Sequence, residues 1–150
     1  MTPPPARTRE QRRTDTLARL ENDVDAWLAT AGEGGPYLVP LSFRWDGTTL
    51  VVATPAASPT GRNLRAGRVR VGLGHTRDVV MIDGVVEVVI AAADVPAILG
   101  DAFAAATGFD PRTLSTPHAY FRIRPQRIQA WRESNELAGR DLMRDGSWLV

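Results

Sequence analysis

Apolar residues recur at helical spacing in the first part of the chain. Between Thr14 and Ala31 they fall on one face of a 3.6-residue helix: Leu17, Leu20, Val24, Trp27, Leu28 and Ala31. Thr14 or Asp15 can cap the start of such a helix, and Gly32 can end it. The pattern therefore predicts a helix over 14–31, preceded by a flexible basic lead-in over residues 1–13.

The middle of the chain shows the alternation and turn residues of paired strands. Tyr37–Trp45 and Thr48–Thr54 flank Asp46-Gly47, a strong two-residue hairpin signal. Pro40 has no backbone donor, so we expect an edge or a bulge at that point of the first strand. Further strands are predicted at 68–73, 78–90 and 119–132, with Asp83-Gly84 as either a bulge or a second turn.

Two more helices are expected between these strands. Ser58 suits the cap and Pro59 the first position of a short helix that ends at Gly67. A longer helix spans Asp94–Thr107 and is closed by Gly108. Its inward residues are expected to be Val95, Ile98, Leu99, Ala102, Phe103 and Ala106.

The order of these elements indicates the fold class. The strands come as hairpins rather than as βαβ units, which favours a mainly β fold, an antiparallel barrel with accessory helices. Neither a repeat nor a second domain is visible, so we expect a single domain over residues 14–150.

Composition excludes several kinds of chemistry. The chain has no Cys, all 18 basic residues are Arg, and only two His are present. Cysteine nucleophiles, Cys-ligated metals, Schiff-base lysines and the P-loop lysine are therefore absent, and no metal site is expected. Hard redox chemistry would have to come from a cofactor.

The positive charge is concentrated at the start of the chain. Four arginines lie in residues 1–13, namely Arg7, Arg9, Arg12 and Arg13. The rest is close to neutral, whereas a nucleic-acid binder more often carries a broad basic face, so we expect no nucleic-acid partner. We find no signal segment, and acids interrupt the apolar stretch 79–99, so we expect no membrane partner and a cytoplasmic location.

The segment Thr54–Leu64 is the best candidate for binding a phosphate. A strand ends at Thr54 and a helix begins near Pro59, where free backbone N–H groups and the positive end of the helix favour an anion. The side chains that can add donors are Ser58, Thr60, Arg62 and Asn63. The alternative is a capped helix with a surface arginine.

Two other segments carry candidate chemistry. Arg122–Trp148 combines arginines with Trp131 and Trp148, which can hold a planar anionic ligand. The alternative, which the pattern favours, is an alternating strand with Trp in the core and Arg in solvent. His75 and Asp78 are a possible acid–base pair, or two surface groups.

The order of the segments resembles the pyridoxamine 5′-phosphate oxidase-like superfamily. The resemblance rests on the strand hairpin, the entry Ser58-x-x-x-Arg62-x-Leu64, the strand Arg68-Val-x-Val71, the strand from Arg77 to Gly84 and a late strand ending in Trp131. It covers roughly 24–148 and is strongest at 60–65, which is similar to the deazaflavin-using branch. It implies a six-stranded split β-barrel that binds FMN or a deazaflavin coenzyme, factor 420.

The resemblance also implies which residues hold the cofactor. By this resemblance, the cofactor phosphate is bound by Ser58, Thr60, Arg62 and Asn63. The ring system of the cofactor lies along the first strands, against Val39, Pro40, Leu41, Ser42 and the segment 52–54, which includes Thr54. The superfamily implies a homodimer whose second subunit contributes a late Trp and Arg, here Trp131 and Arg140.

Two departures from the family pattern narrow the expected function. Many members carry a lysine near the position of Thr60, and this chain has none, so Arg62 would replace it. The tail 133–140 does not resemble the substrate-phosphate residues of vitamin-B6 oxidases, so we do not expect true pyridoxamine phosphate oxidation.

Two functions of different classes follow. One is a flavin- or deazaflavin-dependent oxidoreductase that transfers a hydride between the reduced cofactor and an unidentified small organic substrate. The alternative is a non-catalytic flavin or planar-ligand binding protein for storage, sensing or delivery. The basic start and the Arg-rich late strand could accept an acidic polyglutamate tail, which favours the deazaflavin.

Overall fold

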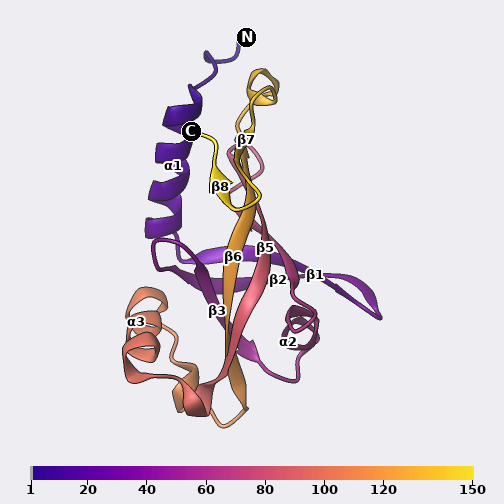
Figure 1. Ribbon diagram of the computed structural model, residues 1–150, viewed down its shortest axis with the longest axis vertical. Helices are drawn as coiled ribbons and strands as arrows, with labels where there is room; N and C mark the ends of the chain where they lie inside the picture. Colours follow the sequence, from indigo (N-terminus) through magenta and orange to yellow (C-terminus); the bar gives the residue numbers. More distant parts are fainter. Residues whose placement is uncertain (1) are drawn as a thin grey trace.

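The computed structural model describes residues 2–150 and, within them, shows an antiparallel six-stranded β-barrel with three α-helices around it (Figure 1). The strand order is β3-β2-β1-β4-β5-β6, and a β3–β6 pairing closes the ring. The barrel strands are β1 Asp25–Gly32, β2 Gly35–Trp45, β3 Leu50–Pro55, β4 Arg68–Leu73, β5 Val79–Ala91 and β6 His118–Trp131. Two short strands, β7 Asp141–Arg144 and β8 Ser147–Trp148, extend the sheet beyond β6. The predicted fold class, a mainly β split barrel, is confirmed.

The barrel core follows from strand alternation. Successive side chains on a strand point to opposite faces, so Leu28 and Thr30 of β1 are buried inside while Trp27 and Ala29 face out. The largest buried side chains of this core are Leu20, Leu28, Phe43, Leu50, Leu64, Ile82, Phe121, Ile123, Ile128 and Leu142. One closed apolar interior therefore organises the domain.

Strands β5 and β6 form the long axis of the molecule (Figure 1). β5 continues through Asp83 and Gly84, where its register against β6 shifts. A Cβ at Gly84 would lie 2.5 Å from Cγ2 of Ile123, so glycine is needed where the strands approach closely. Of the two alternatives for Asp83-Gly84, the bulge is therefore correct.

The prediction for the first segment is wrong. Helix α1 spans Arg9–Asn22, is capped by Thr8, and ends before Asp23, while residues 25–32 form β1. Leu17 and Leu20 do pack on the barrel, but Trp27 and Ala31 belong to a strand, and Gly32 ends that strand. The apolar positions fit both periods over so short a run, and tertiary pairing with β2 and β4 selects the strand.

The expected basic lead-in is also largely ordered, because residues 9–13 form the first turns of α1. Arg7 binds Glu136 through its Nη2 at 2.8 Å and Asp15 through its Nη1 at 2.9 Å. Arg12 is only 4% exposed and donates to the backbone carbonyls of Ala130, Glu136 and Ala138 at 2.9–3.2 Å. These arginines tie the start of the chain to its end rather than projecting into solvent.

Helix α3 (Ala97–Thr107) packs against β2, and Gly108 ends the helix in the left-handed conformation, as expected. Phe103 packs edge-on against Tyr120 with ring centroids 5.4 Å apart, in a second small core. Ile98, predicted to face inward, is instead 87% exposed, and the helix begins at Ala97, later than predicted. Among residues 2–150, none of the helices is long and apolar enough to cross a membrane.

Candidate functional site

Strands β2 and β3 separate toward one end of the barrel. They pair only at Phe43–Trp45 with Leu50–Val52, so residues 35–42 pair with β1 on one side and with no strand of the described chain on the other. Pro40 lies in this free stretch, so of the two alternatives predicted for it, an edge or a bulge, the edge is correct. The edge presents a row of backbone N–H and C=O groups that a ligand can use.

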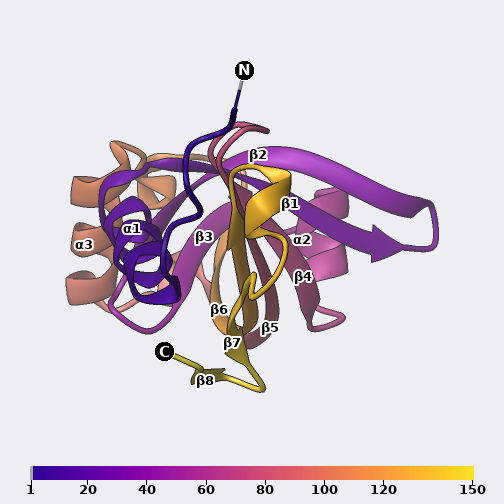
Figure 2. The ribbon, with the colours of Figure 1, turned by 90° about the horizontal axis from the view of Figure 1, so that it is seen from above.

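Helix α2 (Pro59–Leu64) follows β3 and contacts β1, β2 and β3. Figure 2 shows it beside β1. Ser58 caps it as predicted: its Oγ accepts from the Gly61 N–H at 3.0 Å and donates to the Pro55 carbonyl at 2.8 Å. Gly61 packs tightly, since a Cβ there would lie 2.4 Å from the Pro55 oxygen. Ser58 therefore holds the turn and Thr60 is buried, while Arg62 is exposed and Asn63 partly so.

A cavity of about 750 Å³ lies between α2 and the tip of the β1–β2 hairpin. Its lining is Ala31, Gly32, Glu33, Gly34, Gly35, Tyr37, Pro59, Arg62, Asn63 and Ala66. Asn63 Nδ2 donates to Thr30 Oγ1 at 3.2 Å, which orients the amide beside the hairpin. We name the free edge 35–42, Thr54, residues 58–63 and this cavity the split site.

The split site lies beside three arginines that make no ion pair within the described chain. Arg62, Arg65 and Arg68 are exposed, and within residues 2–150 none has a carboxylate within the 4.0 Å of an ion pair. Arg62 donates to the backbone carbonyl of Ala57. Guanidinium groups without an acidic partner are available to a phosphate or a carboxylate.

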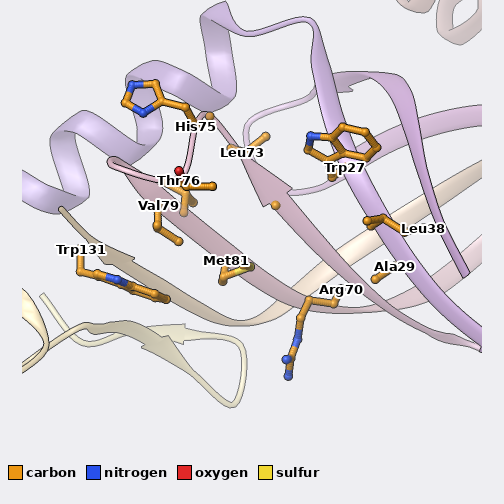
Figure 3. Close-up of a pocket in the computed structure, with 13 residues that line it drawn as sticks. Trp27, Ala29, Leu38, Arg70, Leu73, His75, Thr76, Val79, Met81 and Trp131 are labelled. Atoms are coloured by element: carbon orange, nitrogen blue, oxygen red, sulfur yellow. The ribbon is translucent and has the colours of Figure 1, made fainter. Parts of the chain in front are cut away.

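A second cavity, of about 390 Å³, lies on the outer face of the barrel (Figure 3). Trp27 of β1 is 51% exposed, and Trp131 ends β6 on the far side of Met81 (Figure 3). The lining is Trp27, Ala29, Leu38, Arg70, Gly72, Leu73, Gly74, His75, Thr76, Val79, Val80, Met81 and Trp131. We name it the aromatic basin; its largely apolar wall suits a planar organic molecule.

Polar groups stand only at the rim of the aromatic basin. Arg70 pairs with Asp83 at 2.5 Å, and both side chains are solvent-exposed. His75 Nδ1 accepts from the Arg77 N–H at 3.3 Å, so the neutral ring carries its proton on Nε2. Asp78 instead forms ion pairs with Arg19 and Arg132, so it does not form an acid–base pair with His75.

A further cavity lies along β1 between the aromatic basin and the 750 Å³ cavity of the split site, which we call the split cavity. This third cavity, of about 310 Å³, shares Ala29 and Arg70 with the basin and Ala31 with the split cavity. Ala29 and Ala31 are small outward residues between bulkier neighbours. Three neighbouring cavities therefore follow the outer face of β1, from the aromatic basin to the cavity beside α2.

The structure brings most of the predicted site residues together at the split. Val39 and Leu41 pack toward the barrel core, whereas Pro40 and Ser42 alternate to the outside, where Ser42 Oγ donates to Asp25 at 2.7 Å. Thr54 is buried at the end of β3, just before α2. Four further members lie on or next to α2: Ser58, Thr60, Arg62 and Asn63.

Trp131 and Arg140 are placed elsewhere on the same chain. Trp131 lines the aromatic basin, and the Arg140 guanidinium lies 6.0 Å from the centre of its ring. Neither lines the split cavity.

The prediction from sequence missed the aromatic basin. The sequence pattern assigns no site role to Trp27, Leu38 or Met81, and it places Trp27 on the buried face of a helix. A usable signal exists in residues 25–32, where Ala26, Leu28 and Thr30 alternate with outward residues at strand period.

The comparisons with known proteins agree with this geometry. The model of the pyridoxamine 5′-phosphate oxidase family matches residues 16–132, so the chain belongs to that family. No curated protein matches it.

Several solved structures share the fold at low sequence identity. An F420 reductase is 20% identical, with a TM-score of 0.57 over 74% of this chain and 93% of that one. A FAD-binding protein from Mesorhizobium loti is 22% identical, with a TM-score of 0.61 over 79% and 90%. A protein from Clostridium acetobutylicum related to general stress protein 26 is 12% identical, with a TM-score of 0.64 over 83% and 90%.

The residues of the split site fit the cofactor class that the family implies. The free edge of β2 offers backbone donors and acceptors of the kind that pair with a flavin ring edge. Arg62 and Asn63 add a charged and a neutral donor at the cavity. The free edge of β2 therefore suits the planar ring of such a cofactor, and Arg62 and Asn63 suit its phosphate.

Proposed function

We propose that this protein is an oxidoreductase that binds FMN or the deazaflavin factor 420 and transfers a hydride between the reduced cofactor and a small organic substrate. The observation that carries the proposal is the free edge of β2 standing beside α2, whose Arg62 has no acidic partner. Family membership supports a flavin-related role, and the names of the structural neighbours include an F420 reductase and a FAD-binding protein.

Each part of the split site has a role in this proposal. Arg62 and Asn63 bind the phosphate, while Ser58 and Thr60 hold the turn that positions them. The ring system lies against the segment Val39–Ser42 and the end of β3 at Thr54. The bound cofactor supplies the hydride chemistry, and the protein positions it and restricts water.

The proposal includes a homodimer in which a second copy completes the site with Trp131 and Arg140. Its support is the outer face of the barrel, where Trp27 and Leu38 are 51% and 61% exposed and Tyr37 and Met81 are also exposed. Contiguous exposed apolar surface of this kind commonly marks an interface, and a twofold pair is the commonest arrangement. The aromatic basin of one copy then adjoins the cofactor of the other and receives the organic substrate.

The structure also bears on the choice between the two cofactors. Arg7 and Arg12 bind Glu136 and backbone carbonyls, and Arg13 lies 4.7 Å above the Trp148 ring, so we do not assign these three arginines to an acidic tail. Arg65 and Arg68 follow Arg62 and have no acidic partner in the described chain. They would contact the carboxylates of a deazaflavin tail and leave FMN unaffected.

Cofactor titration followed by turnover tests this function. The purified protein is incubated separately with FMN and with factor 420, and binding is measured from the change in absorbance or fluorescence. The bound, reduced cofactor is then mixed with a panel of small planar acceptors, and its reoxidation is compared with that of the free cofactor. Binding without accelerated reoxidation would favour the alternative, a flavin-binding protein for storage, sensing or delivery; failure to bind either cofactor contradicts both.

A further inference from the structure

A cavity of about 580 Å³ lies where α1, the end of β6 and β7 meet. It is lined by Arg9, Arg127, Leu137, Gly139, Arg140, Asp141, Arg144 and Leu149. Four arginines therefore surround a single carboxylate. None of these residues lines the split cavity or the aromatic basin.

Asp141 organises two of the four arginines. Arg127 Nε and Arg144 Nη2 donate to its carboxylate at 3.2 and 2.8 Å, and Gln129 Nε2 donates at 2.8 Å. The Arg144 hydrogen bond is the largest cause that lowers the pKa of Asp141 to about 2. The carboxylate therefore stays ionised at neutral pH, but one negative charge cannot neutralise the whole group.

The other two arginines have only neutral partners. Arg9 Nη2 donates to the backbone oxygen of Asp141, and its Nε is buried without a hydrogen-bond partner in the described chain. Arg140 makes one long hydrogen bond, 3.3 Å, to the Leu137 carbonyl. Like charges gathered around a cavity repel one another, and an anion placed between them relieves that repulsion.

We propose that this cavity is a binding site for a small polyanion whose two or more negative charges belong to phosphate or carboxylate groups. Guanidinium groups recognise both kinds of oxygen anion through paired N–H donors. Leu137 and Leu149, about 40% exposed each, add apolar wall for the body of an organic anion. The cavity lies apart from the split cavity of its own chain, and it shares Arg140 with the residues that a second copy would contribute to the proposed cofactor site.

Calorimetric titration of the full-length protein with inorganic pyrophosphate and, separately, with citrate tests the proposal. At an ionic strength of about 10 mM, where screening is weak, we expect saturable binding of one anion per chain. Arg127→Gln and Arg144→Gln should each weaken it by about tenfold, the effect of losing one charge-assisted hydrogen bond. Stronger binding of pyrophosphate would assign the site to phosphate groups, and stronger binding of citrate to carboxylates.

Arg124→Gln is the matched control. Arg124 lies on the same strand as Arg127, is similarly exposed at 47% against 45%, and pairs with Glu87, but does not line the cavity. Its substitution should leave anion binding unchanged, and thermal melting of all three variants verifies that they are folded. No saturable binding of either anion, an equal loss in Arg124→Gln, or displacement of the anion by FMN would overturn the proposal.

Discussion

At the scale of single residues, Arg62 is the side chain on which cofactor binding depends most. Replacing it with Gln should weaken FMN binding by about one to two powers of ten, because a charge-assisted hydrogen bond contributes roughly 1.5–3 kcal/mol. The melting temperature without cofactor should hardly change, since the side chain is exposed. Arg65→Gln, which removes the same charge outside the cavity, is the control and should leave FMN affinity intact when both variants are titrated by fluorescence.

Glu136 carries a stability that depends on pH. It is 2% exposed, and its hydrogen bond from Arg7 is the largest cause that lowers its pKa from 4.5 to about 2. A depressed carboxyl pKa stabilises the fold above the unfolded value and loses that contribution as pH falls from 4.5 toward 2. The free energy of unfolding, measured in urea at several pH values, should therefore fall in this window by about 3 kcal/mol more than in Glu136→Gln. Parallel pH profiles for the two proteins would contradict the assignment.

At the scale of elements, α1 is fastened to the C-terminal segment through Arg12. Its guanidinium satisfies three backbone carbonyls in a buried position, so Arg12→Met should leave them unpaired. We expect the free energy of unfolding to fall by roughly 2–4 kcal/mol. Glu10→Gln, at an exposed position of the same helix, should change it by less than about 0.5 kcal/mol in the same urea experiment. Equal stability of the two variants would mean that α1 contributes little to the fold.

At the scale of the whole molecule, the proposed homodimer involves the outer face around Leu38 and the aromatic basin. Leu38→Glu places a charge on this face and should shift the protein toward the monomer at a protein concentration of roughly tens of micromolar. Ile98→Glu, on α3 at an even more exposed position, is the control. Sedimentation equilibrium distinguishes the outcomes: a parent protein that is monomeric throughout would contradict the dimer.

Much of the split site could be predicted from sequence because its signals are local. Ser58, Pro59 and the glycines after them specify a capped helix that depends on a few neighbouring residues. Pro40 marks a strand edge for the same kind of reason, since it lacks a donor wherever it stands. The Asp46-Gly47 turn likewise appears where the residue types require it, between β2 and β3.

The aromatic basin and the arginine cavity could not be predicted in this way. Trp27 fits an amphipathic helix as well as a strand, and only pairing of β1 with β2 and β4 turns it outward. The same contacts bring Arg9 from the start of the chain to Asp141 near its end.

The sequence alone therefore determined the antiparallel β class, the hairpin turns and the capped entry of α2, since these depend on short-range periodicity and backbone chemistry. The tertiary structure decided where α1 ends, which face Trp27 occupies and which arginines are free to bind a ligand. Those features depend on which distant segments pack against each other, because burial and ion pairing require closeness in space and not closeness along the chain.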